Sequence, residues 1–216
     1  MLHHCRTATR LSTFPSIEAL VPIPFHRTTA TMASSTSDVF PPASLATPSN
    51  KLFTTLTSKS QKIAFVETAC GGLLSSSLLS YPGASKIYAG GLTLYTLPSR
   101  IAYGGWTQTD INAYRGPTTK IVAGLAAKAR KDLGADWVVA ESGTAGPTGG
   151  DTRERTPGFC AFAVVGEKGT WVKEVETGSK DRGENMLAFA REAFGLAVEA
   201  IEGKREPDVK AEEGKL

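Results

Sequence analysis

The chain has 216 residues, of which 41% are apolar and 21% charged, which is sufficient for one folded domain with additional segments at its ends. Its 24 basic and 21 acidic side chains give a net charge of only +3, and this excess lies near the N-terminus, so we expect no nucleic-acid partner. No apolar run approaches the roughly 20 residues of a transmembrane helix, so we expect no membrane partner. All three histidines lie within the first 26 residues, which leaves the remainder without imidazole for catalysis or metal binding.

The two ends of the chain differ in composition from the middle. Residues 1–44 contain no glycine, and residues 1–37 are poor in acidic residues and rich in Arg, Ser and Thr. We interpret this region as a disordered leader or a transit peptide, with translation from Met32 as a further alternative. The location is therefore expected to be cytoplasmic or mitochondrial. Residues 203–216 alternate basic and acidic side chains, which predicts a disordered charged tail.

Between these ends, over 45–202, apolar periodicity predicts alternating helices and strands. In chain order we expect a helix over 45–59, a strand over 63–66, a helix over 73–79, a strand over 87–96, a short helix over 97–104, a helix over 118–133, a strand over 137–140, a hairpin of 158–165 with 170–176, and a helix over 182–202. Because strands alternate with helices and the hairpin is antiparallel, the expected fold is a three-layer α/β/α domain with a mixed sheet.

The first candidate site follows the strand over 63–66. Residues Glu67-Thr68-Ala69-Cys70-Gly71-Gly72 connect this strand to a helix. Glycines let the backbone approach a ligand closely, and a helix start presents free N–H groups to an anion. A tight turn that needs glycine only for packing is the alternative interpretation.

The second candidate site follows the strand over 137–140. Four glycines, Gly143, Gly146, Gly149 and Gly150, alternate with hydroxyl side chains such as Ser142 and Thr144. We expect Glu141 either to orient this loop or to be a solvated strand end. Two such loops at strand ends favour a phosphate-bearing small molecule, since open α/β sheets bind ligands at that edge. Neither loop has the spacing of a P-loop or of a dinucleotide-binding motif.

Three stretches together resemble the C-terminal domain of the CinA (competence/damage-inducible protein) family: 67–72, Gly90-Gly91-Leu92-Thr93-Leu94-Tyr95, and 142–150 with its Ala145-Gly146-Pro147 core. The resemblance covers about 45–202. Stand-alone members are nicotinamide mononucleotide deamidases, so it implies a CinA-like α/β fold, a small pyridine nucleotide as partner, and hydrolysis of its carboxamide without metal or cofactor. It also allows a homo-oligomer, which no pattern in this sequence demonstrates.

The residues that the resemblance places in the site depart from the family's pattern at three places. Thr68 stands where the family has its serine nucleophile, Ala69-Cys70 replaces its Cys-Thr pair, and Arg100 stands where it has a lysine. Arginine cannot act as a base, because its pKa exceeds about 12. The candidate catalytic residues are Thr68, Tyr95 and Arg100. The candidate binding residues are Glu67, Cys70, Gly71, Gly72, Ser142, Gly143, Thr144, Ala145, Gly146, Gly149 and Gly150.

Two functions remain open from the sequence. In the first, Thr68 attacks the amide carbon, the loop N–H groups hold the oxyanion, Tyr95, Glu67 or water handles the proton, and Arg100 binds phosphate or the oxyanion. In the second, the two changes have removed catalysis and left a nucleotide-binding protein. A weaker alternative uses Cys70 as the nucleophile, since a thiol at a helix start can have a lowered pKa.

Overall fold

The computed structural model describes residues 39–211. The expectations for the leader up to residue 38 and for residues 212–216 lie outside the described residues. The elements are α1 (Ala43–Lys59), β1 (Ile63–Glu67), α2 (Leu73–Leu79), η1 (Ala84–Lys86), β2 (Tyr88–Thr93), α3 (Leu97–Gly104), α4 (Gln108–Ala113), α5 (Thr119–Leu133), β3 (Trp137–Gly143), η2 (Arg153–Arg155), β4 (Phe159–Gly166), β5 (Gly169–Glu176), α6 (Arg182–Ile201) and β6 (Val209–Lys210).

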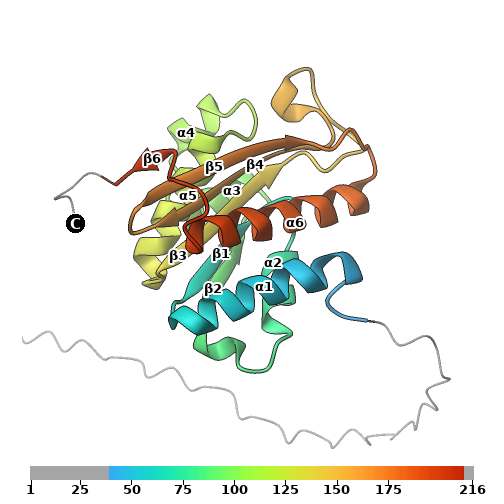
Figure 1. The fold of residues 1–216 in the computed structure, drawn as a ribbon. Helices are drawn as coiled ribbons and strands as arrows, with labels where there is room; N and C mark the ends of the chain where they lie inside the picture. Colours follow the sequence, from blue (N-terminus) through green and yellow to red (C-terminus); the bar gives the residue numbers. More distant parts are fainter. Residues whose placement is uncertain (1–38, 212–216) are drawn as a thin grey trace, which may run out of the picture. The chain divides into compact units, whose positions relative to one another are not determined.

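One mixed sheet runs through the domain (Figure 1). Its strand order is β2-β1-β3-β4-β5-β6. The three strands β2, β1 and β3 are parallel, whereas β4, β5 and β6 are each antiparallel to their neighbours. This arrangement confirms the predicted mixed sheet, including the β4–β5 hairpin.

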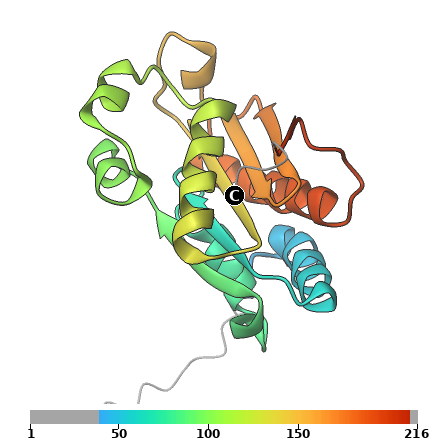
Figure 2. The same cartoon turned by 90° about the vertical axis from the view of Figure 1, so that its left-hand side faces the viewer.

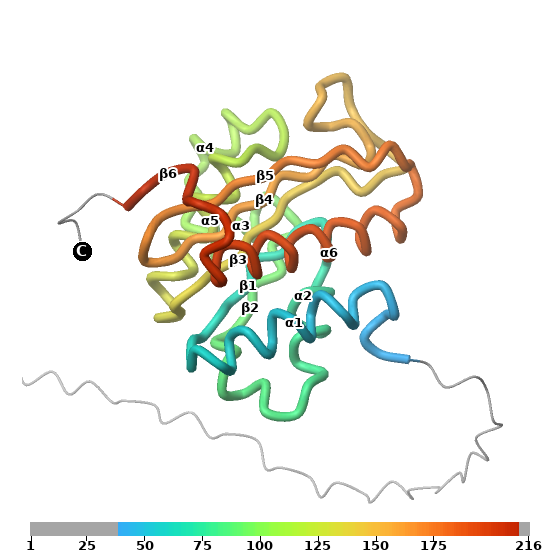
Figure 3. The backbone as a smooth tube through the Cα atoms, viewed as in Figure 1, coloured from blue at the N-terminus to red at the C-terminus, as the bar shows by residue number. Residues whose placement is uncertain are grey.

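Helices cover both faces of the sheet, which gives the three expected layers. Figures 1 and 2 show α1, α2 and α6 on one face and α5, with α3 and α4, on the other. The division follows the alternation of side chains along a strand. In β1, Ile63 and Phe65 join the core beneath α1 and α6, while Ala64 and Val66 join the core beneath α5. The tube in Figure 3 follows α1 and α6 as they pack side by side.

Three expectations about element ends are wrong. The strand expected over 87–96 spans only Tyr88–Thr93, because its pairing with β1 ends at Thr93. The strand over 137–140 continues to Gly143, because its residues pair with β4 as far as Gly143 and Cys160. The charged tail is not solvated throughout: Val209 pairs with Thr170 of β5, and Trp171 Nε1 donates to Arg205 O at 2.8 Å. A charge pattern does not reveal such backbone contacts. In addition, α4 begins with a capping box between Thr107 and Asp110.

Within residues 39–211, none of the helices is both long and apolar enough to cross a bilayer.

Candidate functional site

Strand register brings the two glycine-rich segments together at the carboxyl ends of β1 and β3. Val66 is paired with Ala140, so Thr68 and Ser142, two residues further on, lie beside each other. Alternation of side chains then sends Glu67 and Glu141 to the face covered by α2, and Thr68 and Ser142 to the face covered by α3. The carboxylates and the hydroxyls therefore belong to different environments.

Glu141 organises the first loop rather than the second. Its buried carboxylate accepts the backbone N–H groups of Thr68 at 2.6 Å, Ala69 at 3.2 Å and Cys70 at 2.8 Å. Burial raises the pKa of Glu141 to about 7, and the nearby charge of Glu67 adds to the rise, although the N–H donors oppose it. The expectation that these N–H groups hold an oxyanion is wrong, because Glu141 already occupies them.

Glu67 has a similar structural role at the start of α2. Its carboxylate accepts N–H groups from Gly72 at 2.9 Å, Leu74 at 3.0 Å and Ser75 at 2.9 Å. It thereby satisfies helix donors that would otherwise be unpaired. Glu67 is thus not placed to take the proton of Thr68, and Gly71 and Gly72, both at positive φ, form the turn that wraps around it. Neither these glycines nor Glu67 line the cavity described next.

A cavity of about 300 Å³ opens on the α3 side, beside Thr68 and Ser142. It collects residues from the ends of β1 and β3, the segment after β2, α3, the loop after β3 and the start of α6. Its lining comprises Thr68, Ala69, Tyr95, Leu97, Arg100, Tyr114, Ser142, Gly143, Thr144, Ala145, Gly146, Thr148 and Arg182. The structure therefore brings the three candidate catalytic residues to one cavity.

A chain of hydrogen bonds runs along the floor of this cavity. Thr68 Oγ1 donates to Ser142 Oγ at 3.2 Å, and Arg100 Nη2 donates to the same oxygen at 3.2 Å. All three side chains are buried, with at most 4% of each residue exposed. Ser142 therefore connects the candidate nucleophile to the guanidinium.

Arg100 is a buried cation with unused donors. Its Nε and Nη1 atoms have no hydrogen-bond partner in the described part of the chain. The guanidinium lies against two aromatic rings, with Cζ 4.9 Å from the centroid of Trp106 and 5.1 Å from that of Tyr114. No salt bridge joins it to a carboxylate of residues 39–211. An uncompensated buried charge is costly, so this arrangement favours an anionic ligand.

Tyr95 and Arg182 form the more exposed part of the lining. Arg182 Nη2 donates to the Tyr95 hydroxyl at 3.3 Å, and its Nη1 donates to Gly146 O at 3.1 Å. Arg182 is not among the candidate site residues predicted from the sequence. Its position at the first residue of α6, after the N-cap Asp181, is the signal that points to it.

Neither buried cysteine thiol of the described domain has surroundings that activate a nucleophile. Burial raises the pKa values of both Cys70 and Cys160 well above the usual range, and the Glu141 carboxylate adds to the rise. Cys70 packs beneath the loop, where its Sγ lies 3.9 Å from Met186 O, and it does not line the cavity. The hypothesis of a reactive Cys70 is therefore wrong.

Much of the second loop's glycine content serves packing. A Cβ on Gly149 would lie 2.5 Å from Arg155 O, and Gly150 donates its N–H to the same oxygen at 2.9 Å. Both glycines lie outside the cavity lining. Gly143, Ala145, Gly146 and Thr144 remain in the lining, together with Thr148.

Two aromatic residues in the neighbourhood of Arg100 were missed as site residues. Neither Trp106 nor Tyr114 is among the candidate site residues predicted from the sequence. Their rings are 5.6 Å apart and meet the guanidinium across the turn of chain that contains α4. Cation–π contacts between such distant positions leave no periodic signal in a sequence.

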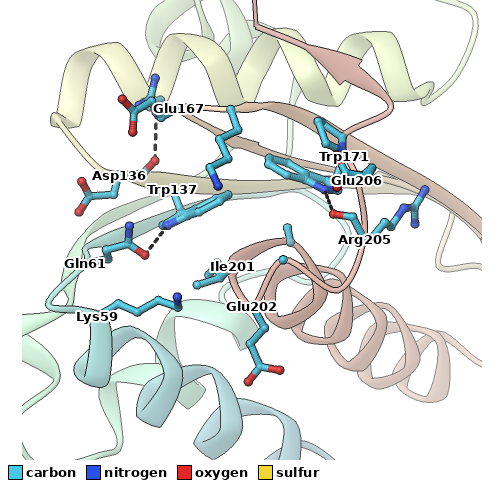
Figure 4. A pocket seen from close by; sticks show the side chains of 15 residues that line it. Lys59, Gln61, Asp136, Trp137, Glu167, Trp171, Ile201, Glu202, Arg205 and Glu206 are labelled. Carbon is cyan, nitrogen blue, oxygen red and sulfur yellow. Dashed lines mark hydrogen bonds between the residues drawn. The ribbon is translucent and has the colours of Figure 1, made fainter.

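A larger cavity, of about 610 Å³, lies at the opposite end of the sheet, where β1 and β3 begin (Figure 4). Trp137 and Trp171 meet there at 5.5 Å, and their N–H groups are already donated to Gln61 Oε1 and Arg205 O. Basic and acidic side chains are balanced around it, as Figure 4 shows for Lys59, Arg205, Glu202 and Glu206. It contains no buried polar group without a partner, so the smaller cavity is the better candidate site.

No group of His, Cys, Asp and Glu within residues 39–211 has the arrangement of a metal site. The fold and the cavity define the class: a three-layer α/β domain with a cavity at the carboxyl edge of its parallel strands, lined by Arg100 and Arg182.

The chain belongs to the CinA C-terminal domain family, whose family model matches residues 45–201. A CinA-like protein of Prochlorococcus marinus (strain AS9601) is 32% identical over 129 residues, which cover 59% of this chain but only 30% of that protein. The chain thus spans about a third of the length of the curated relatives it matches.

Two solved structures share the fold. The competence or damage-inducible protein from Enterobacter asburiae is 23% identical, with a TM-score of 0.67 over 73% of this chain and 98% of that chain. The competence/damage-inducible protein from Agrobacterium tumefaciens is also 23% identical, with a TM-score of 0.68 over 74% of this chain and 97% of that chain.

Proposed function

We propose that this chain binds a nicotinamide-type mononucleotide in the Thr68–Arg100 cavity and hydrolyses its carboxamide to the carboxylate, with release of ammonia. The observation that carries the proposal is the buried Thr68 hydroxyl, which lines the cavity and is hydrogen-bonded through Ser142 to Arg100. The family supplies the expected nucleotide, and the cavity supplies a cationic site of suitable size.

The residues can be assigned to a balanced reaction. Thr68 Oγ1 forms a bond to the carboxamide carbon, the C–N bond breaks, and ammonia leaves with the hydroxyl proton. Water then cleaves the resulting ester, which yields the carboxylate and restores Thr68. Arg100 offers the N–H donors for the oxyanion, a role that the loop amides occupied by Glu141 do not fill. Tyr95, which lines the same cavity, is the side chain left to transfer the proton.

A second candidate function is binding without turnover. Its supporting observation is that the hydrogen bonds from Thr68 lead to Ser142 and Arg100, and arginine takes up no proton. Both nearby carboxylates, Glu67 and Glu141, accept backbone N–H groups on the other face of the sheet. In this case the cavity retains the ligand but lacks a base.

Ammonia release separates the two functions. The full chain is incubated with nicotinamide mononucleotide, and ammonia and the acid nucleotide are both quantified, while calorimetry measures binding. Hydrolysis predicts equal amounts of ammonia and acid. Binding without either product supports the second function, and absence of binding contradicts both.

A further inference from the structure

We propose that Arg100 makes this cavity a carboxylate receptor, so that the acid form of the ligand binds more tightly than the carboxamide form. The choice of a pyridine nucleotide rests on the proposed function. The preference for a carboxylate rests on the surroundings of one side chain.

Arg100 lacks the partner that a buried guanidinium requires. Only 4% of the residue is exposed, and two of its three nitrogens donate to nothing in the described chain. Ser142 Oγ, the acceptor for the third, is a neutral hydroxyl. A carboxylate supplies both the missing acceptors and the missing charge, and a guanidinium is the side chain whose geometry suits it best.

The two aromatic rings hold the guanidinium in place. Trp106 and Tyr114 both lie about 5 Å from Cζ, which stabilises the cation without using its N–H donors. The N–H donors lie in the plane of the guanidinium, and the Nε and Nη1 donors therefore keep their hydrogen-bonding capacity for a ligand. Trp106 and Tyr114 act as positioning residues for Arg100.

The carboxylate end of the ligand, rather than its phosphate, belongs at Arg100. Arg100 contacts Ser142, which accepts the Thr68 hydroxyl, so the cation lies at the end of the cavity where the carboxamide would react. A second cation, Arg182, lies beside the exposed Tyr95 at another part of the lining. The cavity thus offers separate cationic partners for a carboxylate and for a phosphate.

Access to the free donors requires a small movement. Nε and Nη1 are covered in the ligand-free chain. Tyr114 follows α4, a short helix that has no buried residue, and α4 is therefore the neighbouring element that is least fixed by the core. We expect ligand binding to displace the Tyr114 side chain and so to change the fluorescence of the adjacent Trp106 in a chain with Trp137→Phe and Trp171→Phe.

Calorimetry on Thr68→Ala, which prevents turnover, tests the preference with three ligands: nicotinic acid mononucleotide, nicotinamide mononucleotide, and nicotinic acid riboside, which lacks the phosphate. We expect the acid nucleotide to bind at least about tenfold more tightly than the amide nucleotide, because charge-assisted hydrogen bonds are roughly twice as strong as neutral ones. Adding Arg100→Met should remove the difference, whereas Arg153→Met, at an exposed arginine outside the cavity, should preserve it.

Several results would overturn the proposal. Equal affinity of the cavity for the acid and the amide nucleotide would overturn it. If, in addition, the riboside without phosphate does not bind, or Arg100→Met does not bind the nucleotides, Arg100 holds the phosphate instead. An acid preference that survives in Arg100→Met places the carboxylate elsewhere. If no nucleotide binds, the proposed function fails, and the inference is then tested by comparing how nicotinate and nicotinamide change the thermal stability of the chain. Stabilisation by nicotinate alone, and only when Arg100 is present, supports the inference. Equal effects of the two compounds refute it.

The thermal stability of Arg100→Met separates a receptor from a structural arginine. Removing a buried charge that has no counter-charge should leave the ligand-free melting temperature unchanged or higher. A clear decrease would show that Arg100 stabilises the fold, and would contradict the receptor role.

Discussion

Thr68, Ser142 and Arg100 are joined by hydrogen bonds, but none of these side chains is a base that can take the proton from Thr68. The Thr68 hydroxyl donates to Ser142, and the guanidinium on the far side can only donate. An ammonium side chain in the same place differs, because lysine can lose its proton when buried. The identity of residue 100 therefore sets the balance between binding an anion and activating the hydroxyl.

Substituting Arg100 with lysine should raise ammonia release and weaken acid binding. A deprotonated lysine at this position can accept the proton that Ser142 relays from Thr68, so we expect kcat to rise about tenfold or more, with the increase developing as pH rises. The pH profile of kcat for Arg100→Lys and the wild type checks this, with Arg153→Lys as the matched control. An unchanged or lower kcat with an unchanged profile would show that the proton leaves by another route.

At the scale of single residues, the sequence predicted which positions meet but not what all of them do. Thr68, Tyr95, Arg100 and Ser142 do line one cavity. Glu67 and Glu141 behave differently from expectation because their partners are backbone N–H groups, which every residue carries and no motif distinguishes. The partners of Arg100 were equally hidden, since rings from either side of α4 reach it only in the folded chain.

At the scale of elements, the loop between β1 and α2 depends on a carboxylate from β3. Glu141 holds three consecutive N–H groups, including that of Thr68, and so fixes the backbone of the candidate nucleophile. Burial disfavours the charged form of Glu141 and raises the pKa of its carboxyl from an ordinary 4.5 to about 7. The stability of the loop that Glu141 holds therefore depends on pH.

This linkage predicts a contribution to stability that falls as pH rises. The folded chain retains a proton on Glu141 that the unfolded chain releases near pH 4.5, so the contribution is fully present below that pH and is lost on passing through about pH 7. We expect the free energy of unfolding of the wild type to fall relative to Glu141→Gln between these values, as measured by urea denaturation. Glu167→Gln, at an exposed glutamate, should parallel the wild type. Parallel curves for Glu141→Gln would contradict the linkage.

The segment after α6 is a second element that matters for stability. Arg205 O accepts the Trp171 indole N–H, and Asp208 accepts the N–H of Val172 at 2.8 Å. A chain that ends at Gly203 exposes Trp171, now 2% exposed, and loses these bonds. We expect the free energy of unfolding of this shortened chain to be about 2–4 kcal/mol lower than that of the full chain. Tryptophan emission during urea denaturation measures both effects. Asp208→Asn, which weakens the bond to Val172 and removes the ion pair with Arg205 but leaves the Trp171 bond to Arg205 O, should lose less. Unchanged stability would mean that the contacts of β6 and of the segment before it do not stabilise the fold.

At the scale of the whole molecule, apolar periodicity was sufficient to predict the layers. The apolar runs of β1 and β3 and the two-sided patterns of α5 and α6 indicate which faces are buried. The three-layer fold with a mixed sheet therefore follows from the sequence. The position of the cavity also follows, because parallel strands end at the same edge. The limits of β3 and β6 do not follow, because they are set by pairing with β4 and β5, which no local pattern encodes.

Ammonia release from nicotinamide mononucleotide by the full chain tests the central claim, that the Thr68 hydroxyl hydrolyses a carboxamide in the cavity at this edge. We expect ammonia and acid nucleotide to form in equal amounts with the wild type. Thr68→Ala should lose at least about a thousandfold in rate, as expected for removal of a nucleophile, while Ser76→Ala, a neighbouring hydroxyl bonded to Gly72 O outside the cavity, retains activity. No ammonia from the wild type, or an equal rate from Thr68→Ala, would contradict the account.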